Sequence, residues 1–165
     1  MKILVTGNNG YIGTVLSEIL IKNNFEVVGL DNNYYENCKL SAVTGVSKQI
    51  IKDIRDIEKK DLEGIDGIIH LAALSNDPLG SLIPQLTEEI NFKATIKLAN
   101  FAKFCKVKRF VFVSSQSMYG ISKLNIELDE DKSEKNPVTE YANTKWRSEI
   151  ELKKLNNDDF VVCCF

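Results

Sequence analysis

The chain has 165 residues, of which 44% are hydrophobic and 27% are charged, a composition typical of one soluble globular domain. Its formal net charge of -2 provides no broad cationic surface, which argues against nucleic acid or an anionic membrane as a partner. The sequence contains no run of about eighteen apolar residues and no signal-peptide pattern at its start, so we expect a cytoplasmic protein without a membrane span.

Six apolar, β-branched runs of strand length follow one another along the chain. They are Lys2–Thr6, Phe25–Leu30, Gln49–Lys52, Gly67–His70, Arg109–Val113 and Phe160–Cys164. None of them alternates cleanly between apolar and polar residues, which is typical of parallel strands that are buried on both faces.

Helical spacing of apolar residues lies between these runs. One helix is predicted to have Ile12, Val15, Leu16, Ile19 and Leu20 on one face, and another to have Ile90, Ala94, Leu98, Phe101, Ala102 and Cys105 on one face. The alternation predicts an α/β fold, a Rossmann-type doubly wound parallel sheet with helices on both faces. We expect a single domain over residues 1–165, with a polar loop at Ile121–Asn136.

The four cysteines do not follow the spacing of a metal site. Cys38, Cys105, Cys163 and Cys164 contain no Cys-x-x-Cys pair, and the chain has one histidine. We therefore expect reduced structural thiols and no bound metal.

A glycine-rich turn is predicted between the first strand and the first helix. Gly7, Gly10 and Gly13 occur there at three-residue spacing, where glycine lets the backbone approach a pyrophosphate at the N-terminus of the helix. Asp31 ends the second strand, at the offset expected for the acid that binds the adenosine ribose. The alternative for Asp31 is a turn former. Its charge would repel a 2′-phosphate, and the four residues after it include no cation, so NAD is favoured over NADP.

The Gly-x-x-Gly-x-x-Gly spacing resembles that of the extended short-chain dehydrogenase/reductases. Further segments match this family in order: Asp53-Ile54-Arg55-Asp56, His70-Leu71-Ala72-Ala73, Val113–Gly120 and Tyr141-Ala142-Asn143-Thr144-Lys145. The resemblance implies a cofactor site made of Gly7, Asn9, Gly10, Tyr11, Ile12, Gly13, Asp31, Asn32, Asp53, Ile54, Leu71, Ala72, Ala73, Tyr141 and Lys145. It covers essentially the whole chain, and it implies that the family's C-terminal substrate-binding part is absent.

The same resemblance identifies Ser115, Tyr141 and Lys145 as catalytic. Tyr141 and Lys145 are four residues apart, so on a helix they share a face. A cation about 4 Å from a phenolate stabilises it by about 4 kcal/mol at an effective dielectric constant near 20. Tyr141 would then be the base for a sugar hydroxyl, and Ser115 would bind the developing carbonyl oxygen. Taken singly, each residue could equally be a packing aromatic, a solvated charge or a strand-end hydroxyl.

Two other residues have open interpretations. Asn91, at the start of a predicted helix Asn91–Lys106, resembles the family's site-ordering asparagine but could equally be an N-cap. His70 ends a buried strand and has its family counterpart in a structural segment, so we expect no catalytic role for it.

The resemblance extends to nucleotide-sugar epimerases, dehydratases and reductases. Dehydratases carry an Asp-Glu pair where this chain has Gln116 and Ser117, which favours an NAD-dependent epimerase-like oxidoreductase acting on a nucleotide sugar, with reduction or dehydration as the enzymatic alternatives. A non-catalytic NAD-binding module and a truncated, inactive fragment are the other hypotheses. The family implies a homodimer through Asn91–Lys106 and Val138–Leu155, or a partner chain that supplies the missing substrate domain.

Overall fold

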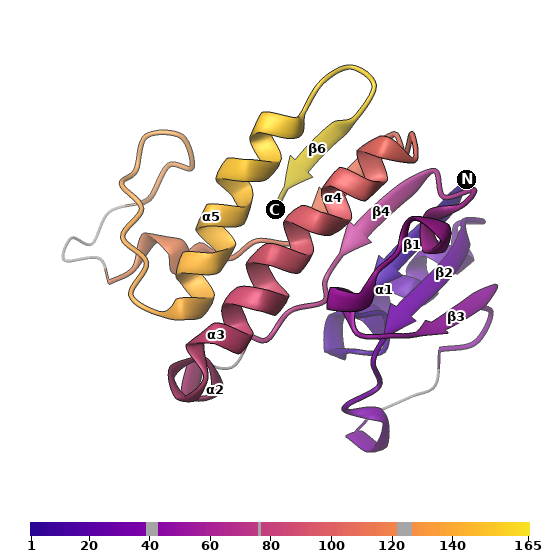
Figure 1. Cartoon of the computed structure of the whole chain (residues 1–165), viewed down its shortest axis with the longest axis horizontal. Coiled ribbons are helices and arrows are strands. Elements are labelled where there is room, and N and C mark those ends of the chain that lie inside the picture. The colour runs from indigo at the N-terminus through magenta and orange to yellow at the C-terminus, as the bar shows by residue number, and fades with distance from the viewer. Residues whose placement is uncertain (39–42, 76, 122–126) are drawn as a thin grey trace.

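A computed structural model describes residues 1–38, 43–75, 77–121 and 127–165. Within these residues, six strands form one parallel sheet in the order β3-β2-β1-β4-β5-β6 (Figure 1). The strands are β1 Lys2–Thr6, β2 Glu26–Asp31, β3 Lys48–Ile51, β4 Gly67–His70, β5 Arg109–Phe112 and β6 Val161–Cys164. This order is the one expected of a doubly wound dinucleotide-binding sheet, so the predicted fold class is confirmed.

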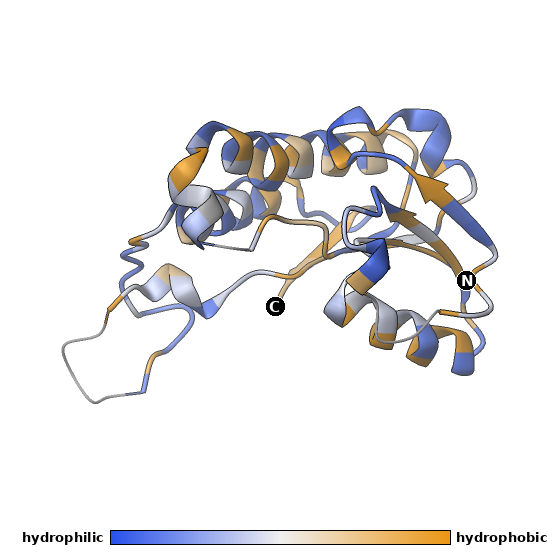
Figure 2. Cartoon of the chain, turned by 90° about the horizontal axis from the view of Figure 1, so that it is seen from below, coloured by the Kyte–Doolittle hydropathy of each residue, from blue (hydrophilic) through white to orange (hydrophobic). Residues whose placement is uncertain are grey.

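Helices cover both faces of the sheet (Figure 2). The α-helices are α1 Tyr11–Lys22, α2 Asp77–Leu82, α3 Pro84–Thr87, α4 Ala94–Phe104 and α5 Glu140–Leu155. A π-helical turn, η4 Glu88–Lys93, joins α3 to α4, and short 3₁₀ turns occupy η1 Glu36–Cys38, η2 Ile54–Asp56, η3 Lys59–Leu62 and η5 Gln116–Tyr119. No helix in the described part of the chain is long and apolar enough to cross a membrane.

Successive residues of the strands point to opposite faces and fill two separate cores. In β1, Leu4 belongs to the larger core beneath α4 and α5, which also contains Phe110 and Phe112. Its neighbours Ile3 and Val5 belong to the smaller core on the α1 side. Burial on both faces explains why the central strands β1 and β2 read as apolar runs without alternation, whereas the edge strands β3 and β6 are mostly exposed or half-buried.

The predicted apolar face of α1 is only partly correct. Leu16 and Leu20 pack against the smaller core, but Ile12, Val15 and Ile19 are 59%, 59% and 51% exposed. Small side chains decide this orientation, because the helix turns Gly13 and Ser17 toward the sheet and buries both. The larger apolar residues are consequently rotated toward solvent.

The boundaries of the other two helices also differ from the prediction. Asn91 lies in a continuous helical segment, here called the helical rod, that consists of α3, η4 and α4. This rod begins at Pro84 rather than at Asn91, and it ends at Phe104. Asn91 therefore lies inside the rod, in the π-helical turn, and its interpretation as an N-cap is wrong. α5 begins at Glu140 instead of Val138, because the extended residue Thr139 caps it by accepting a hydrogen bond from the backbone N–H of Ala142 at 3.2 Å.

Candidate functional site

A cavity of about 340 Å³ lies at the carboxyl ends of the central strands, the edge at which doubly wound sheets bind their ligands. It brings together most of the residues that the sequence singled out. These are Gly7, Gly10, Tyr11, Ile12, Gly13, Asp31, Asn32, Asp53, Ile54, Leu71, Ala72, Ala73, Tyr141 and Lys145. Two predicted residues, Asn9 and Ser115, do not line this cavity.

The glycine turn needs its glycines for close backbone contacts. Gly7 has a φ of +70°, and a Cβ atom there would lie 2.9 Å from the backbone nitrogen of Ala72. A Cβ on Gly13 would lie 2.1 Å from the carbonyl oxygen of Gly7. The turn therefore packs tightly between the first turn of α1 and the segment that follows β4.

The turn is also fixed to the sheet through Asn8. This side chain is fully buried, and its amide exchanges two hydrogen bonds with the amide of Gln49, at 2.9 and 3.1 Å. The pair lies over Gly29, where a Cβ atom would come within 2.4 Å of both amides. An asparagine in the turn, a glycine in β2 and a glutamine in β3 thus form one packed unit.

The N-terminus of α1 faces the cavity without a side-chain cap. Gly10 is the N-cap residue and carries no side chain, and the first turn has no acidic residue. The first amide with an acceptor inside the helix is that of Thr14, which donates to the carbonyl of Gly10 at 3.0 Å. The preceding amides and the helix dipole make this end suitable for an anion.

Asp31 forms a turn and also lines the cavity. One carboxylate oxygen accepts the backbone N–H of Asn33 at 2.8 Å, and the other accepts the backbone N–H of Asn9 at 3.1 Å. Asn9 also donates its side-chain amide to Asn33 at 2.7 Å. Because a carboxylate has about four acceptor positions, Asp31 keeps capacity for two ligand hydroxyls. The two interpretations of Asp31 are compatible with each other.

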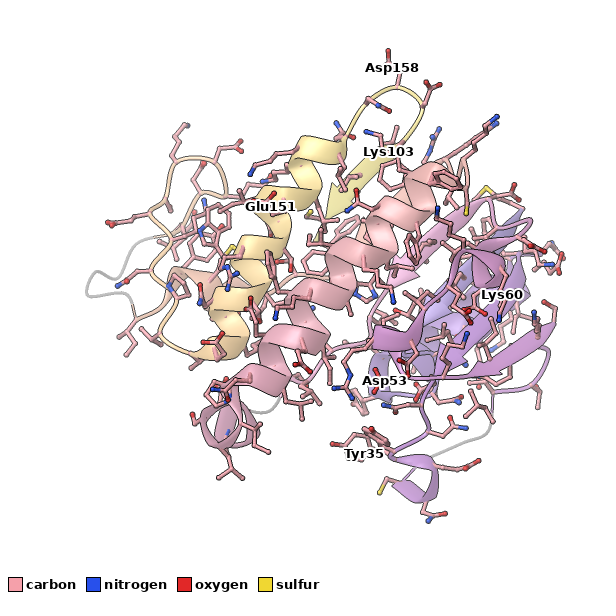
Figure 3. The ribbon with its side chains drawn as sticks, in the orientation of Figure 1. Tyr35, Asp53, Lys60, Lys103, Glu151 and Asp158 are labelled. Atoms are coloured by element: carbon pink, nitrogen blue, oxygen red, sulfur yellow. The ribbon has the colours of Figure 1, made fainter. Side chains whose placement is uncertain are left out.

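Asp53 and Tyr35 come from separate loops and line the same cavity (Figure 3). The guanidinium of Arg55 binds both carboxylate oxygens of Asp53, at 3.1 and 2.9 Å. These hydrogen bonds hold the pKa of Asp53 below its usual value, against the opposing effect of burial. Asp53 is therefore a fixed anionic acceptor at this end of the cavity.

Sequence reasoning did not identify Lys52, Tyr34, Tyr35 or Leu74 as cavity residues. The backbone N–H of Lys52 donates to the carbonyl of Asp31 at 3.0 Å, so a lysine that lies outside the four residues after Asp31 joins the cavity beside it. Its ammonium group is engaged elsewhere, by Glu58 at 2.9 Å and Asp61 at 2.7 Å. Only the folding of β3 beside β2 brings Lys52 to this position, so no local pattern predicts it.

Tyr141 and Lys145 both reach the cavity from α5. The ammonium group of Lys145 lies 5.8 Å from the ring centre of Tyr141 and 4.6 Å from that of Phe112. It donates a hydrogen bond to the carbonyl of Val113 at 2.6 Å. Burial lowers the pKa of Lys145 to about 8, so the protonation state of this amine responds to small changes in the cavity.

The lowered pKa of Lys145 predicts how stability depends on pH. The unfolded chain binds a proton at this amine up to its ordinary pKa of 10.5, whereas the folded chain releases it near pH 8. The free energy of unfolding should therefore rise by about 3 kcal/mol as the pH increases through this interval. Urea unfolding of the wild type and of Lys145→Met between pH 8 and pH 10.5 measures the free energy of unfolding of each protein. The difference between their pH dependences gives the contribution of Lys145.

The matched control for this experiment is Lys60→Met, because the side chain of Lys60 is 67% exposed. Lys60→Met should follow the pH dependence of the wild type, and Lys145→Met should lack the rise. A Lys145→Met curve parallel to that of the wild type would contradict the prediction.

Ser115 is not among the residues that line the cavity, although Val113 is. Its hydroxyl caps η5 by accepting the backbone N–H of Ser117 at 3.2 Å, and it lies 2.7 Å from the hydroxyl of Ser117. The strand-end interpretation of Ser115 thus describes its present contacts, and its predicted role at a substrate stays a prediction.

Asn91 is a buried residue that binds the backbone of a cavity-lining residue, Leu74. It is 1% exposed, its side-chain oxygen accepts the backbone N–H of Leu74 at 2.8 Å, and its side-chain nitrogen donates to the carbonyl of Leu74 at 2.9 Å. Leu74 lines the cavity. Of the two interpretations of Asn91, these contacts support the ordering of the site.

Residues 3–165 match the model of the NAD dependent epimerase/dehydratase family. A UDP-glucose 4-epimerase of Lactobacillus helveticus is 35% identical over 153 residues, which cover 90% of this chain and 45% of that protein. A UDP-glucose 4-epimerase of Bacillus subtilis is 31% identical over 171 residues, covering 96% of this chain and 49% of that protein. The chain thus spans about half of the length of these relatives.

Solved structures show the same similarity. The UDP-N-acetylglucosamine 4-epimerase of Methanobrevibacter ruminantium matches with a TM-score of 0.88 and 28% identity, over 99% of this chain and 53% of that one. The UDP-glucose 4-epimerase of Thermus thermophilus, determined in complex with NAD, also matches with a TM-score of 0.88, at 25% identity, over 99% of this chain and 54% of that one.

Proposed function

The chain belongs to the NAD-dependent epimerase/dehydratase family, and on that premise we propose that it forms the cofactor-binding and proton-transfer part of a nucleotide-sugar 4-epimerase-like oxidoreductase. One observation carries the proposal. Tyr141 and Lys145 line the same cavity as the glycine turn and Asp31. A proton-transfer pair and a dinucleotide site within one cavity are what hydride transfer at a sugar carbon requires.

The residues of the cavity fit NAD. Gly7 and Gly13 have no side chains, and the close contacts around them leave no room for any. The backbone of the turn is therefore not covered by side chains at these positions, and a pyrophosphate can approach the uncapped N-terminus of α1. Asp31 has free acceptor positions for ribose hydroxyls, and its charge opposes a 2′-phosphate. Lys52 does not reverse this preference, because Glu58 and Asp61 already neutralise it.

Each proposed catalytic residue has a definite task in this reaction. NAD bound in the cavity supplies the hydride acceptor. The ammonium form of Lys145 stabilises Tyr141 as a phenolate, and this phenolate takes the proton of the sugar hydroxyl and becomes a neutral phenol. Ser115 donates a hydrogen bond to the oxygen that becomes a carbonyl. This task requires the Ser115 hydroxyl to turn from Ser117, its present neighbour at 2.7 Å, toward the substrate.

The local sequence after Ser115 favours epimerisation over dehydration. Water elimination needs an acid to protonate the leaving hydroxyl, but the two positions after Ser115, where dehydratases have an Asp-Glu pair, carry Gln116 and Ser117. The relatives reported above are named 4-epimerases. Epimerisation would need the cofactor held by the cavity to accept a hydride and give it back within one turnover, and simple reduction is the alternative reaction.

The substrate is proposed to be a UDP-sugar, as in the names of these relatives. Since the chain spans about half of their length, the surface that holds the nucleotide sugar is proposed to come from a further segment or a partner chain. The assignment of residues 1–165 as one NAD-binding domain, homodimerisation and a cytoplasmic location stay predictions of the sequence.

Thermal unfolding with and without nucleotide tests the cofactor. A ligand present at about 100 times its dissociation constant adds about 2.7 kcal/mol to the stability of the folded state, so NAD should raise the melting temperature of the 165-residue chain while NADP should not. Asp31→Ala removes the proposed ribose acceptor and should abolish the rise.

The matched control is Asp66→Ala, which removes a carboxylate outside the cavity. Asp66 accepts the backbone N–H of Lys2 at 2.7 Å, and this variant should keep the response to NAD even if its melting temperature falls. A chain that remains folded but shows no response to NAD would contradict the proposed cofactor site.

A second candidate function is an NAD-binding module without turnover, which the present position of Ser115 favours. The two functions differ in what happens after NAD binds. When UDP-glucose is added together with the segment or partner chain that holds the nucleotide sugar, an enzyme forms NADH or exchanges the sugar epimers, whereas a module binds NAD with no change in the UDP-sugar. Chromatography of the UDP-sugar after incubation separates these outcomes.

A further inference from the structure

His70 lies in a continuous hydrogen-bonded chain behind the cavity. It is 1% exposed on β4, and its ring centre lies 6.1 Å from that of Phe110 and 6.0 Å from that of Phe112. Its Nδ1 atom lies 2.7 Å from the hydroxyl oxygen of Thr6 at the end of β1, and its Nε2 atom lies 2.8 Å from the hydroxyl oxygen of Thr95 on α4. The imidazole therefore bridges the start of the glycine turn and the helix that covers the sheet.

The position of the imidazole proton follows from Thr95. The hydroxyl of Thr95 lies 2.7 Å from the carbonyl oxygen of Asn91, which can only accept, so Thr95 donates its single proton there. Toward His70 it can then act only as an acceptor. The proton of a neutral His70 consequently lies on Nε2, and Nδ1 presents its lone pair to Thr6. Burial first, and the charge of Lys145 second, lower the pKa of His70 to about 3, which keeps the ring neutral.

This arrangement fixes the hydroxyl of Thr6. Its oxygen accepts the backbone N–H groups of Leu71 and Ala72, both at 3.2 Å, and the Leu71 amide is shared with the backbone carbonyl of Thr6 at 3.1 Å. A hydroxyl has one proton and two lone pairs, so it can accept both amides only while its proton is given to a third group. His70 Nδ1 is that group. Leu71 and Ala72 line the cavity, and Ala72 is the residue against which Gly7 packs.

The other end of this series of hydrogen bonds, at Thr95 and Asn91, also reaches the segment of residues 71–74 that lines the cavity. The carbonyl oxygen of Asn91 accepts from Thr95 and also from the hydroxyl of Ser148, at 3.2 Å. The side chain of Asn91 holds Leu74 by two hydrogen bonds. The wall formed by residues 71–74 is thus held at its first two residues by Thr6 and at its last residue by Asn91, and His70 with Thr95 connects the two attachments.

We propose that His70 is a positioning residue for the NAD site, which holds the wall of residues 71–74 in place by keeping its proton on Nε2 and accepting the hydroxyl proton of Thr6. The proposal rests on the proposed function, because it assumes that the cavity binds NAD. His70 does not line the cavity and takes no part in the chemical step.

The tautomer can be measured directly, because the chain contains one histidine. A ¹⁵N NMR spectrum of the whole chain labelled at histidine gives one imidazole pattern. The expected pattern at neutral pH is a protonated Nε2 and an unprotonated Nδ1, with and without NAD. A proton on Nδ1, or a doubly protonated ring, would overturn the proposal, and this result does not depend on whether NAD binds.

The connection to the cavity is tested by Thr95→Val. This change removes the acceptor of Nε2 at a residue that does not line the cavity. The proton should then move to Nδ1, Thr6 should have to accept from it, and one of the two amide contacts of the wall should be lost. We expect the tautomer signal to change and the dissociation constant of NAD to rise by about tenfold.

Thr87→Val is the matched control. Thr87 is a fully buried threonine in a neighbouring helical turn, and its hydroxyl has no partner among the described residues. It should change neither the tautomer nor the affinity for NAD. If Thr95→Val binds NAD as the wild type does, the role of His70 is refuted, whereas a folded wild type that fails to bind NAD refutes the proposed function.

Discussion

Tyr141→Phe is expected to slow hydride transfer by about 10²- to 10⁴-fold, the usual contribution of a positioned acid or base. The variant removes one hydroxyl and keeps the aromatic ring, which is half-buried on α5 beside Lys145. Without the phenol, no group at this position takes the proton of the sugar hydroxyl. Single-turnover formation of NADH after addition of a UDP-sugar measures the rate, in protein that includes the further segment or partner chain proposed to hold the nucleotide sugar.

The affinity for NAD separates this effect from a damaged site. Tyr141→Phe should leave the dissociation constant of NAD within about threefold of the wild-type value, a change of less than 1 kcal/mol. Tyr119→Phe is the matched control, since Tyr119 closes η5 and does not line the cavity. A Tyr141→Phe protein that transfers hydride at the wild-type rate would exclude Tyr141 as the base.

The second large effect is expected from Gly13→Ala. A methyl group at this position would lie 2.1 Å from the carbonyl oxygen of Gly7 and 2.7 Å from the Cα atom of Asn8. Both neighbours are backbone atoms, so α1 has to move away from the turn. We expect a loss of about 1–3 kcal/mol in the free energy of unfolding, the usual cost of overpacking, together with a loss of NAD binding of at least about tenfold.

Gly80→Ala is the control for the effect of adding a methyl group. Gly80 lies in α2, and the nearest atom to an added Cβ is the hydroxyl oxygen of Thr87 at 3.5 Å, an ordinary contact. In a helix this change should be neutral or stabilise the chain by about 0.5–1 kcal/mol. Urea unfolding and NAD titration of both variants test the pair. Unchanged stability and binding in Gly13→Ala would show that the turn is not tightly packed.

The sheet could be predicted because its central strands, such as β1 and β2, are buried on both faces. Apolar runs such as Ile3–Val5 have to pack against helices on two sides, and this requirement leaves a continuous pattern in the sequence. The glycine turn and Asp31 were also accessible, because their meaning depends on short distances along the chain. Tyr141 and Lys145 are four residues apart, so a helix alone places them together.

Features that depend on contacts between distant segments could not be predicted. The orientation of α1 depends on how closely Gly13 and Ser17 approach the sheet, which hydrophobic periodicity does not measure. Asn91 resembled an N-cap because the earlier helical turns from Pro84 onward lacked a clear apolar pattern. Lys52 joins the cavity only through the pairing of β3 with β2.

The unit formed by Asn8, Gly29 and Gln49 couples the side chains that three distant positions can accommodate. A larger residue at position 29 can be accommodated only if the amides of Asn8 and Gln49 become smaller or withdraw. A larger residue at position 29 alone would therefore clash with both amides, and exchange of Asn8 or Gln49 alone would leave the other amide without this partner. Chimaeras of related sequences should accordingly tolerate crossover points after residue 49 better than crossover points between residues 8 and 49, which separate the three partners.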